Sequence, residues 1–145
     1  MTTVVNTTFT DTYAAVLQFY ARQVQLLDSG RFEEYAATFT ADGEFQHTPN
    51  MPAARTTAGI IAELRSFNTR FDGDPVQRRH WFNMINLAER PDGAFDASFY
   101  ALVLTTRPGV KEPLVGPSCF VNDVLVLEDG ELRNRSRKVG HDQLF

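Results

Sequence analysis

The sequence predicts an α+β fold with three N-terminal helices, interrupted by one short strand, followed by an antiparallel run of longer strands. Two observations carry this prediction: apolar residues recur every three or four positions in the first half of the chain, and alternate with polar ones between turn signals in the second. The length of 145 residues fits one domain, 1–145. With 43% hydrophobic and 22% charged residues, the composition is that of a globular protein rather than a disordered one.

The helices are expected in the first half of the chain. Asp11 or Thr12 is the expected N-cap of a first helix that ends near Asp28. Spacings of three and four place one apolar stripe along it, made of Tyr13, Leu17, Tyr20, Val24 and Leu27. A second helix is predicted over 31–38. A third begins at Thr56 or Thr57 and ends before the Asp-Gly-Asp-Pro turn at 72–75.

The strands are expected mainly in the second half. A turn at 41–43 precedes a short strand over 44–47, and longer strands are predicted over 78–88, 94–106, 118–127 and 131–139. Pro-Asp-Gly at 91–93 and Glu-Asp-Gly at 128–130 are hairpin signals. Residues 107–117 are a loop or an irregular strand entry. In the strand over 78–88, alternation places one set of side chains on a common face: His80, Phe82, Met84 and Asn86.

Charge and cysteine content exclude several classes of function. The formal net charge of −4, without a long basic run, argues against nucleic-acid binding. Arg133, Arg135 and Arg137 are expected to share one strand face, more simply a solvated surface or an oligomer contact than an anion site. Cys119 is the only cysteine, so no intramolecular disulfide is possible, and we expect a buried, inert thiol. The polar N-terminus predicts no membrane segment and, by default, a cytoplasmic protein.

Three short motifs resemble those of nuclear-transport-factor-2-like (NTF2-like) domains. They are Leu-Asp-Ser-Gly-Arg-Phe at 27–32, Phe-Thr-Ala-Asp-Gly-Glu-Phe at 39–45 and Arg-Arg-His-Trp-Phe-Asn at 78–83. From Tyr13 to Val139 the chain is similar to the branch that contains scytalone dehydratase, SnoaL-type polyketide cyclases and ring-hydroxylating dioxygenase β subunits. The resemblance implies a cystatin-like α+β barrel, in which a cone-shaped, curved sheet of mixed or antiparallel strands packs on the three N-terminal helices.

The same resemblance implies roles for individual residues. His80 matches an active-site histidine of the dehydratase, and Asp28 the aspartate that orients and charges it. Asn122 lies near a substrate-contacting asparagine, and His47 roughly where a tyrosine helps to polarise the carbonyl. Two positions depart from the dehydratase pattern, because Leu27 replaces a tyrosine and Thr105 stands at the second histidine position.

The residues themselves leave two interpretations of His80 open. Its imidazole titrates near neutrality, which suits general acid–base catalysis, and a nearby aspartate would fix its tautomer. Alternatively, His80 is a hydrogen-bonded core histidine and Asp28 caps the turn into the second helix. Metal binding ranks low, because the candidate ligands lie on separate elements. His141 and Asp142 are expected to belong to the tail.

An aromatic-lined pocket is the second site prediction. The twelve Phe residues form either a Phe-rich core or the wall of an apolar cavity. Asn122 is expected to point inward with Phe120, while Tyr20 and Tyr100 either donate hydrogen bonds into a cavity or pack in the core. Trp81 is expected to pack beneath a helix or at a subunit contact. Phe145 is a candidate lid. Phe82, Phe120, Tyr20, Asn122, His47 and Thr105 are therefore the predicted substrate-contacting residues.

Two classes of function remain open on this evidence. One is a cofactor-independent dehydratase, cyclase or isomerase for an aromatic or polyketide-derived ketone, in secondary-metabolite biosynthesis. The other is a non-catalytic small-molecule carrier or a structural partner subunit. Catalysis requires Asp28 and His80 to face one cavity within hydrogen-bond reach, whereas a structural role predicts a filled cone and a large apolar outer face. A homodimer is expected in either case, with a trimer as the alternative.

Overall fold

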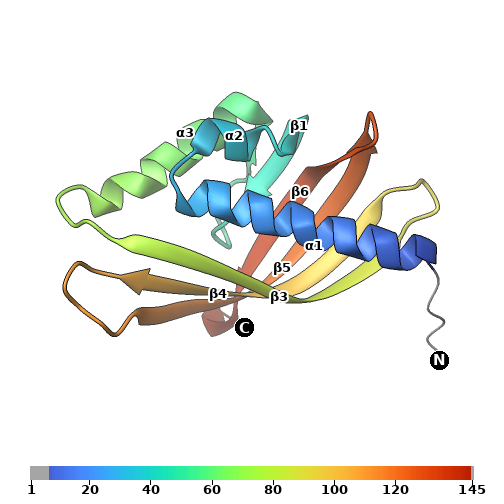
Figure 1. Ribbon diagram of the computed structural model, residues 1–145. Coiled ribbons are helices and arrows are strands. Elements are labelled where there is room, and N and C mark those ends of the chain that lie inside the picture. Colours follow the sequence, from blue (N-terminus) through green and yellow to red (C-terminus); the bar gives the residue numbers. More distant parts are fainter. Residues whose placement is uncertain (1–6, 145) are drawn as a thin grey trace.

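The computed structural model describes residues 7–144 and shows the predicted α+β fold (Figure 1). Along the chain the elements are α1 (Thr7–Asp28), α2 (Phe32–Ala36), β1 (Phe39–Gln46), β2 (Ala54–Arg55), α3 (Thr56–Asn68), a 3-10 turn (Thr69–Phe71), β3 (Gln77–Glu89), β4 (Phe95–Thr106), β5 (Leu114–Glu128), β6 (Glu131–His141) and a final 3-10 turn (Asp142–Leu144). The expected order of helices and strands is confirmed. None of the described helices is long and apolar enough to cross a membrane.

The strands form one curved sheet, with its helices on one side (Figure 1). Among the described residues the strand order is β2-β1-β6-β5-β4-β3. β1 runs parallel to β6, and the other neighbouring strands are antiparallel. Both predicted hairpin turns join neighbouring antiparallel strands. In the Pro-Asp-Gly turn, Gly93 has a φ of 87°, a conformation that glycine adopts without steric strain because it has no Cβ.

Two apolar clusters make the core. One lies between α1 and the middle of the sheet and is centred on Val16, Phe99, Val121 and Leu125. The other lies between α2, α3 and β1 and includes Leu26, Tyr35, Phe45, Ile60 and Leu64. Burying this apolar surface is the main force that holds the helices on the concave face of the sheet.

The predicted start and apolar stripe of α1 need correction. The helix already includes Thr7, and the Thr12 hydroxyl donates to the Thr8 carbonyl oxygen at 2.9 Å, as a residue inside a helix does rather than a cap. Leu17 is 46% exposed. The buried face instead runs through Val16, Tyr20, Gln23 and Leu26. The prediction counted only apolar residues, whereas Gln23 is buried because hydrogen bonds satisfy its amide.

The turn predicted at 41–43 is a bulge inside β1. The pairing of β1 with β6 shifts between Phe39 and Glu44, and the strand continues on both sides. A Cβ at Gly43 would lie 3.0 Å from the Thr40 carbonyl oxygen and 3.1 Å from the Phe39 Cβ, so glycine allows this close approach. His47 follows the strand rather than ending it.

A second bulge changes which residues of β3 face inward. Met84 has a φ of 58°, and the pairing with β4 shifts between Asn83 and Asn86. His80 and Phe82 share the inner face, but Met84 is 65% exposed and Ile85 is buried instead. The expectation that Met84 shares the face of His80 is therefore wrong, because one inserted residue reverses the alternation.

A third irregularity, in β6, overturns the expectation for the arginines. Pairing with β5 shifts between Val124 and Leu125, so Arg135 is an extra residue in β6. Asn134 and Arg137 are consequently both buried. Arg137 is 2% exposed and does not belong to a solvated or contact surface. Phe145, the predicted lid, lies outside the described residues.

Candidate functional site

Asp28 and His80 form a hydrogen-bonded pair on the inner side of the sheet. The Asp28 Oδ1 lies 2.6 Å from the His80 Nδ1, and the Asp28 Oδ2 accepts the His80 backbone N–H at 3.1 Å. The side chains are 4% and 17% exposed, respectively. Because a carboxylate only accepts hydrogen bonds, it holds the proton on Nδ1. Nε2 is therefore the ring nitrogen left for a ligand.

The end of α1 positions Asp28. The backbone N–H groups of Gly30 and Arg31 donate to the Leu27 and Leu26 carbonyl oxygens, each at 3.0 Å, which closes the last turn. Gly30 adopts a φ of 73° to make this closure. The Gln77 side-chain amide then donates to the Asp28 carbonyl oxygen at 3.2 Å and ties the start of β3 to the end of α1. His80 is three residues further along that strand.

Arg78 lies two residues before His80 and belongs to the same face of β3, upstream of the bulge. Its guanidinium carbon lies 5.2 Å from the Phe67 ring centroid and 5.6 Å from that of Phe71. Burial, then the nearby Arg70, lowers the pKa of Arg78. The sequence interpretation missed Arg78, although its spacing of two from His80 was a usable signal.

The Thr105 position is beside Arg78. β3 and β4 pair Arg78 with Thr105, and Thr105 is 8% exposed, so it faces inward at the same end of the sheet as His80. Val103 pairs with His80 in the same register. Thr105 therefore faces inward beside Arg78, two residues along the sheet from the position that pairs with His80.

His47 forms a second acid–histidine contact on the helical side of the site. Its Nε2 lies 2.8 Å from the Glu63 Oε1, and its Nδ1 lies 3.1 Å from the Thr48 Oγ1. The ring also meets the Phe67 ring edge-on at a centroid distance of 5.1 Å. Both ring nitrogens are thus engaged, and the Phe67 ring that His47 meets is the one that lies 5.2 Å from the Arg78 guanidinium carbon.

The Tyr20 hydroxyl is used inside the core. It donates to the Asp123 Oδ2 at 2.8 Å, and burial raises the pKa of Tyr20 well above its usual value. Arg137 donates to both oxygens of Asp123, at 2.9 and 2.7 Å, and also to Tyr35 and Gln23. Tyr20 therefore belongs to a buried polar network. Phe82 packs on that network, with its ring centroid 5.1 Å from the Arg137 guanidinium carbon.

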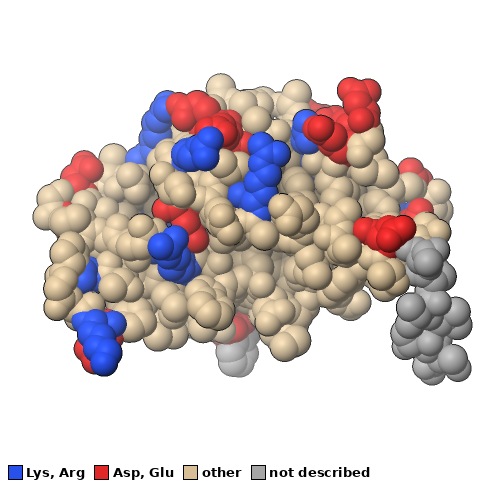
Figure 2. Space-filling view, in the orientation of Figure 1, with Lys and Arg blue, Asp and Glu red and all other residues tan. Residues whose placement is uncertain are grey.

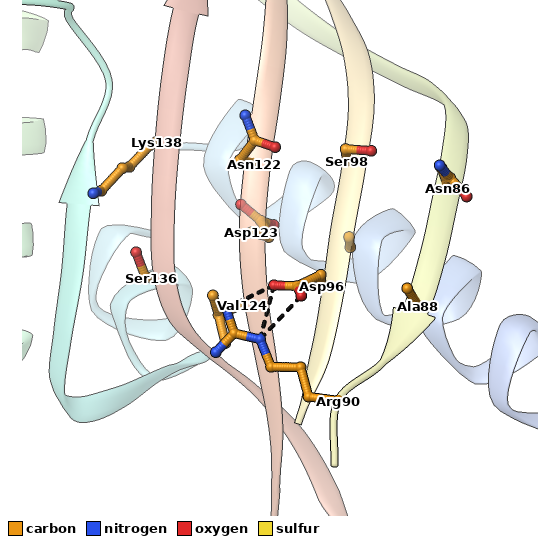
Figure 3. A pocket seen from close by; sticks show the side chains of 11 residues that line it. Asn86, Ala88, Arg90, Asp96, Ser98, Asn122, Asp123, Val124, Ser136 and Lys138 are labelled. Atoms are coloured by element: carbon orange, nitrogen blue, oxygen red, sulfur yellow. Dashed lines mark hydrogen bonds and ion pairs between the residues drawn. The ribbon is translucent and has the colours of Figure 1, made fainter. Parts of the chain in front are cut away.

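Asn122 and Phe120 lie on the other face of the sheet. β5 alternates so that Cys119, Val121 and Asp123 are buried, while Phe120 is 41% exposed. Asn122 lines a hollow on this outer face together with Ser98, Asp96, Arg90 and Lys138 (Figure 3), with α1 behind the sheet in that view. The expectation that Asn122 and Phe120 point inward is wrong. The prediction had the alternation of this strand in the opposite phase.

Neither of two hollows on the described surface contains His80 or Asp28. One is the outer-face hollow, and the other runs along α1 and α2 past Arg22, Gln25 and Glu34. The face in Figure 2 carries interspersed acidic and basic side chains, and much of it is uncharged. The described residues contain no group of three or more potential metal ligands. The Asp28–His80 contact therefore lies on the inner face, while both of these hollows lie elsewhere.

Several other predicted residues have clear positions. Cys119 is buried at 4% exposure, as expected, and burial raises the pKa of its thiol to about 11. Trp81 and Tyr100 are 64% and 58% exposed on the outer face, so neither packs beneath a helix or reaches the inner side. Asp142 accepts a hydrogen bond from the Ser118 hydroxyl at 2.6 Å, which ties the tail to β5.

Comparison with known proteins identifies a domain family and several solved structures to which this chain is similar. A SnoaL-like domain model matches residues 9–138. ActVI-ORFA from Streptomyces coelicolor is 54% identical, with 92% of this chain and 98% of that chain covered and a TM-score of 0.87. A protein from Catenulispora acidiphila, solved in complex with S-DNPA, is 51% identical over 93% of this chain and 96% of that chain, with a TM-score of 0.85. Aln2 from a Streptomyces species is 39% identical over 98% and 96%, with a TM-score of 0.86.

More distant structures share the fold alone. An NTF2-like protein with a cystatin-like fold from Novosphingobium aromaticivorans is 16% identical over 92% of this chain and 84% of that chain, with a TM-score of 0.77. The β subunit of benzoate 1,2-dioxygenase from Burkholderia mallei is 14% identical over 99% and 94%, with a TM-score of 0.70. Both agree with the fold that the sequence predicts. No curated protein matches the sequence.

Proposed function

The chain belongs to the SnoaL-like family of NTF2-like domains, and we propose that it is a cofactor-independent dehydratase, cyclase or isomerase. Its substrate would be an aromatic or polyketide-derived ketone, and its reaction would proceed by general acid–base catalysis. The observation that carries this proposal is the 2.6 Å contact between Asp28 and His80, which leaves Nε2 available on the inner face of the sheet.

The proposed reaction begins with proton transfer to His80. Nε2 removes a proton from the carbon next to the ketone, which leaves an enolate, and the imidazolium so formed is stabilised by the Asp28 carboxylate. In a dehydration, Nε2–H then donates its proton to the departing hydroxyl, which leaves as water. In a cyclisation the enolate carbon attacks a second carbonyl, whose oxygen takes the proton. In an isomerisation the proton returns to a different carbon.

The similar proteins support a polyketide-related role. SnoaL-type polyketide cyclases belong to the branch that the sequence resembles, and ActVI-ORFA and Aln2 match nearly the whole chain. The Catenulispora acidiphila protein is seen in complex with S-DNPA, which supports a small-molecule partner for this chain. We propose that the protein acts in secondary-metabolite biosynthesis and that it does so in the cytoplasm. A fluorescent fusion of the protein that is found outside the cytoplasm would contradict this location.

Deuterium exchange tests the proton transfer directly. The protein is incubated in D2O with a panel of hydroxylated aromatic and bicyclic ketones, and exchange next to the carbonyl is followed by NMR while products are followed by mass. We expect exchange to fall about 10²–10⁴-fold in His80→Gln. His141→Gln, at the end of β6, is the matched control and should exchange like the wild type. Exchange that is indifferent to His80 would refute the proposal.

A non-catalytic role is the second candidate, because part of the outer face of the sheet is apolar. Trp81, Met84, Tyr100, Leu102 and Phe120 are all exposed there, by 38–65%. Such a face fits a structural subunit, and it also fits a homodimer of an enzyme. Turnover in the exchange assay separates the two functions, since a structural subunit alone would give none.

We propose that the outer face joins two copies of the chain, with a trimer as the alternative. Tyr100→Glu places a charge in the middle of this face and is expected to shift the protein to monomer in analytical ultracentrifugation at micromolar concentration. Leu17→Glu, on the exposed side of α1, is the control and should leave the assembly intact. A monomeric wild type would contradict the dimer.

We also propose that residues 1–145 form one domain. Limited proteolysis that releases a smaller stable fragment would contradict this proposal.

A further inference from the structure

Arg78 has a buried N–H group without an acceptor. Its Nε is shielded from solvent and has no hydrogen-bond partner in the described structure. No carboxylate among the described residues forms an ion pair with its guanidinium, although several more exposed arginines are paired. The fully buried Arg137 shows the usual arrangement, since it donates to both oxygens of Asp123. Burial of an unpaired donor is unfavourable, so an unpaired Arg78 indicates a partner that binds from outside the chain.

The charged groups around Arg78 favour an anion as its binding partner. Asp28 is the carboxylate that favours its charge, but both Asp28 oxygens are engaged by His80. Arg70 contributes a second positive charge, with its guanidinium carbon 3.8 Å from the Phe67 centroid. Two cations thus share the Phe67 ring without an acidic partner for Arg78. An incoming anion would relieve this repulsion and satisfy the Nε–H.

Two aromatic rings next to Arg78 specify the body of the ligand. Phe67, from α3, and Phe71, from the 3-10 turn, both lie within 5.6 Å of its guanidinium carbon. When a planar guanidinium is held against aromatic rings, the N–H donors along its edge point in fixed directions. They can then donate hydrogen bonds to the two oxygens of a carboxylate or to a single anionic oxygen. The rings themselves offer apolar area for a flat ligand.

We propose that Arg78 binds an anionic oxygen of an aromatic ligand, next to His80. This inference rests on the proposed function, because it places the oxygen beside the group that would move the proton. The spacing of two residues puts Arg78 and His80 about 7 Å apart along the strand, which one or two fused rings can span. The anionic oxygen has two possible sources, a carboxylate carried by the ligand or the enolate oxygen that forms when the proton is removed.

Equilibrium binding of small aromatic probes tests the inference without any turnover. The probes are naphthalene-2-carboxylate for the carboxylate source, 4-nitrophenolate above its own pKa for the enolate source, and naphthalene-2-carboxamide and 4-nitroanisole as their neutral counterparts. Affinities are measured by NMR titration, with the Arg78 Nε–H resonance as a local reporter. At least one anion is expected to bind the wild type about tenfold or more tightly than its neutral counterpart.

The variants separate Arg78 from its neighbours. Arg78→Gln should abolish the anion preference while leaving the affinity for the neutral probes within about twofold, and Arg78→Lys should restore only part of it. Arg79→Gln, whose side chain is exposed on the opposite face of β3, is the matched control and should keep the preference. Circular dichroism and thermal melting verify that each variant is folded.

Each outcome decides the inference. Preference for the carboxylate identifies a ligand that carries an acid group, and preference for the phenolate alone identifies the enolate as the oxygen that Arg78 binds. Absence of any anion preference in the wild type, or its survival in Arg78→Gln, overturns the inference. His80→Gln should bind both anions as the wild type does. Anion binding through Arg78 in a wild type that shows no exchange chemistry, or exchange that persists in His80→Gln, would refute the proposed function and leave the role of Arg78 standing.

Discussion

At the scale of single residues, the site depends on the Asp28 carboxylate, because both of its oxygens contact His80. One carboxylate oxygen contacts the imidazole and the other accepts the backbone N–H of the same residue, so the side chain fixes both the ring and the strand that carries it. A side chain held from two directions is a pre-organised partner, which loses little conformational freedom when a ligand arrives.

Replacement of Asp28 by Asn tests this coupling. The amide keeps the shape but loses the charge that stabilises an imidazolium, and it can turn its NH2 group toward the ring and reverse the tautomer. We expect proton transfer to fall about 10²–10⁴-fold, measured by the same deuterium exchange. Asp11→Asn, exposed on the same helix, should have no effect. Full activity in Asp28→Asn would show that the pair is structural only.

At the scale of elements, bulges decide which side chains meet. The bulges in β3 and β6 each add one residue to the strand and reverse the faces beyond it. In β3, the bulge at Met84 allows His80 to face the site and Ile85 to face the core, although the two are an odd number of residues apart. In β6, the extra residue allows Asn134 and Arg137 to be buried together.

Because Met84 adopts a left-handed conformation, we expect glycine to be more stable than a β-branched residue at that position, the reverse of the usual order in a strand. With a φ of 58°, a β-branched residue is strained whereas glycine is not. We expect Met84→Gly to be more stable than Met84→Val by about 1–2 kcal/mol, measured by urea unfolding. The same pair of substitutions at Ala88, an exposed position of the same strand, should rank in the opposite order. An equal ranking at both positions would contradict the bulge.

The network around Arg137 predicts a large stability loss when one partner is removed. Arg137→Met leaves the buried Asp123 carboxylate without its cation, and we expect a cost of about 3–5 kcal/mol in the free energy of unfolding. Lys138→Met, the exposed neighbour, should cost less than about 0.5 kcal/mol. Adding Asp123→Asn to Arg137→Met should recover part of the loss, since no unpaired charge then remains. A mild effect of the single change would show that the network is solvated.

At the scale of the whole molecule, buried ionisable groups predict how stability varies with alkaline pH. Burial raises the pKa of the Cys119 thiol to about 11, and it raises those of Tyr20 and Tyr35 as well. In the unfolded chain these groups ionise at their usual, lower pKa values. Between those values and the folded ones, the folded state retains protons that the unfolded state releases, so unfolding is favoured as the pH rises.

We therefore expect the free energy of unfolding to be constant near neutrality and to fall from about pH 9 toward pH 11. Urea titrations across this range measure the slope. Cys119→Ala should make the slope shallower, because the thiol no longer contributes. The thiol should also react with a disulfide reagent much more slowly in the native protein than in urea at the same pH. A flat profile up to pH 11 would contradict the burial of these groups.

The sequence by itself determined the order of the elements and the end of the first helix near Asp28. Periodicity and turn residues are local properties, and they encode these features directly. That Asp28 and His80 would meet followed from the resemblance to known domains and not from any pattern, because 52 positions separate them.

Only the tertiary structure decided which face Asn122, Phe120 and Arg137 occupy, and that Arg78 lacks a partner. Alternation fixes relative faces within a strand, but its phase in β5 depends on pairing with β4 and β6, and a bulge in one strand is visible only against its neighbour. Whether a buried cation is paired likewise depends on every element around it. These contacts arise from the packing of distant segments, which no local pattern in the chain specifies.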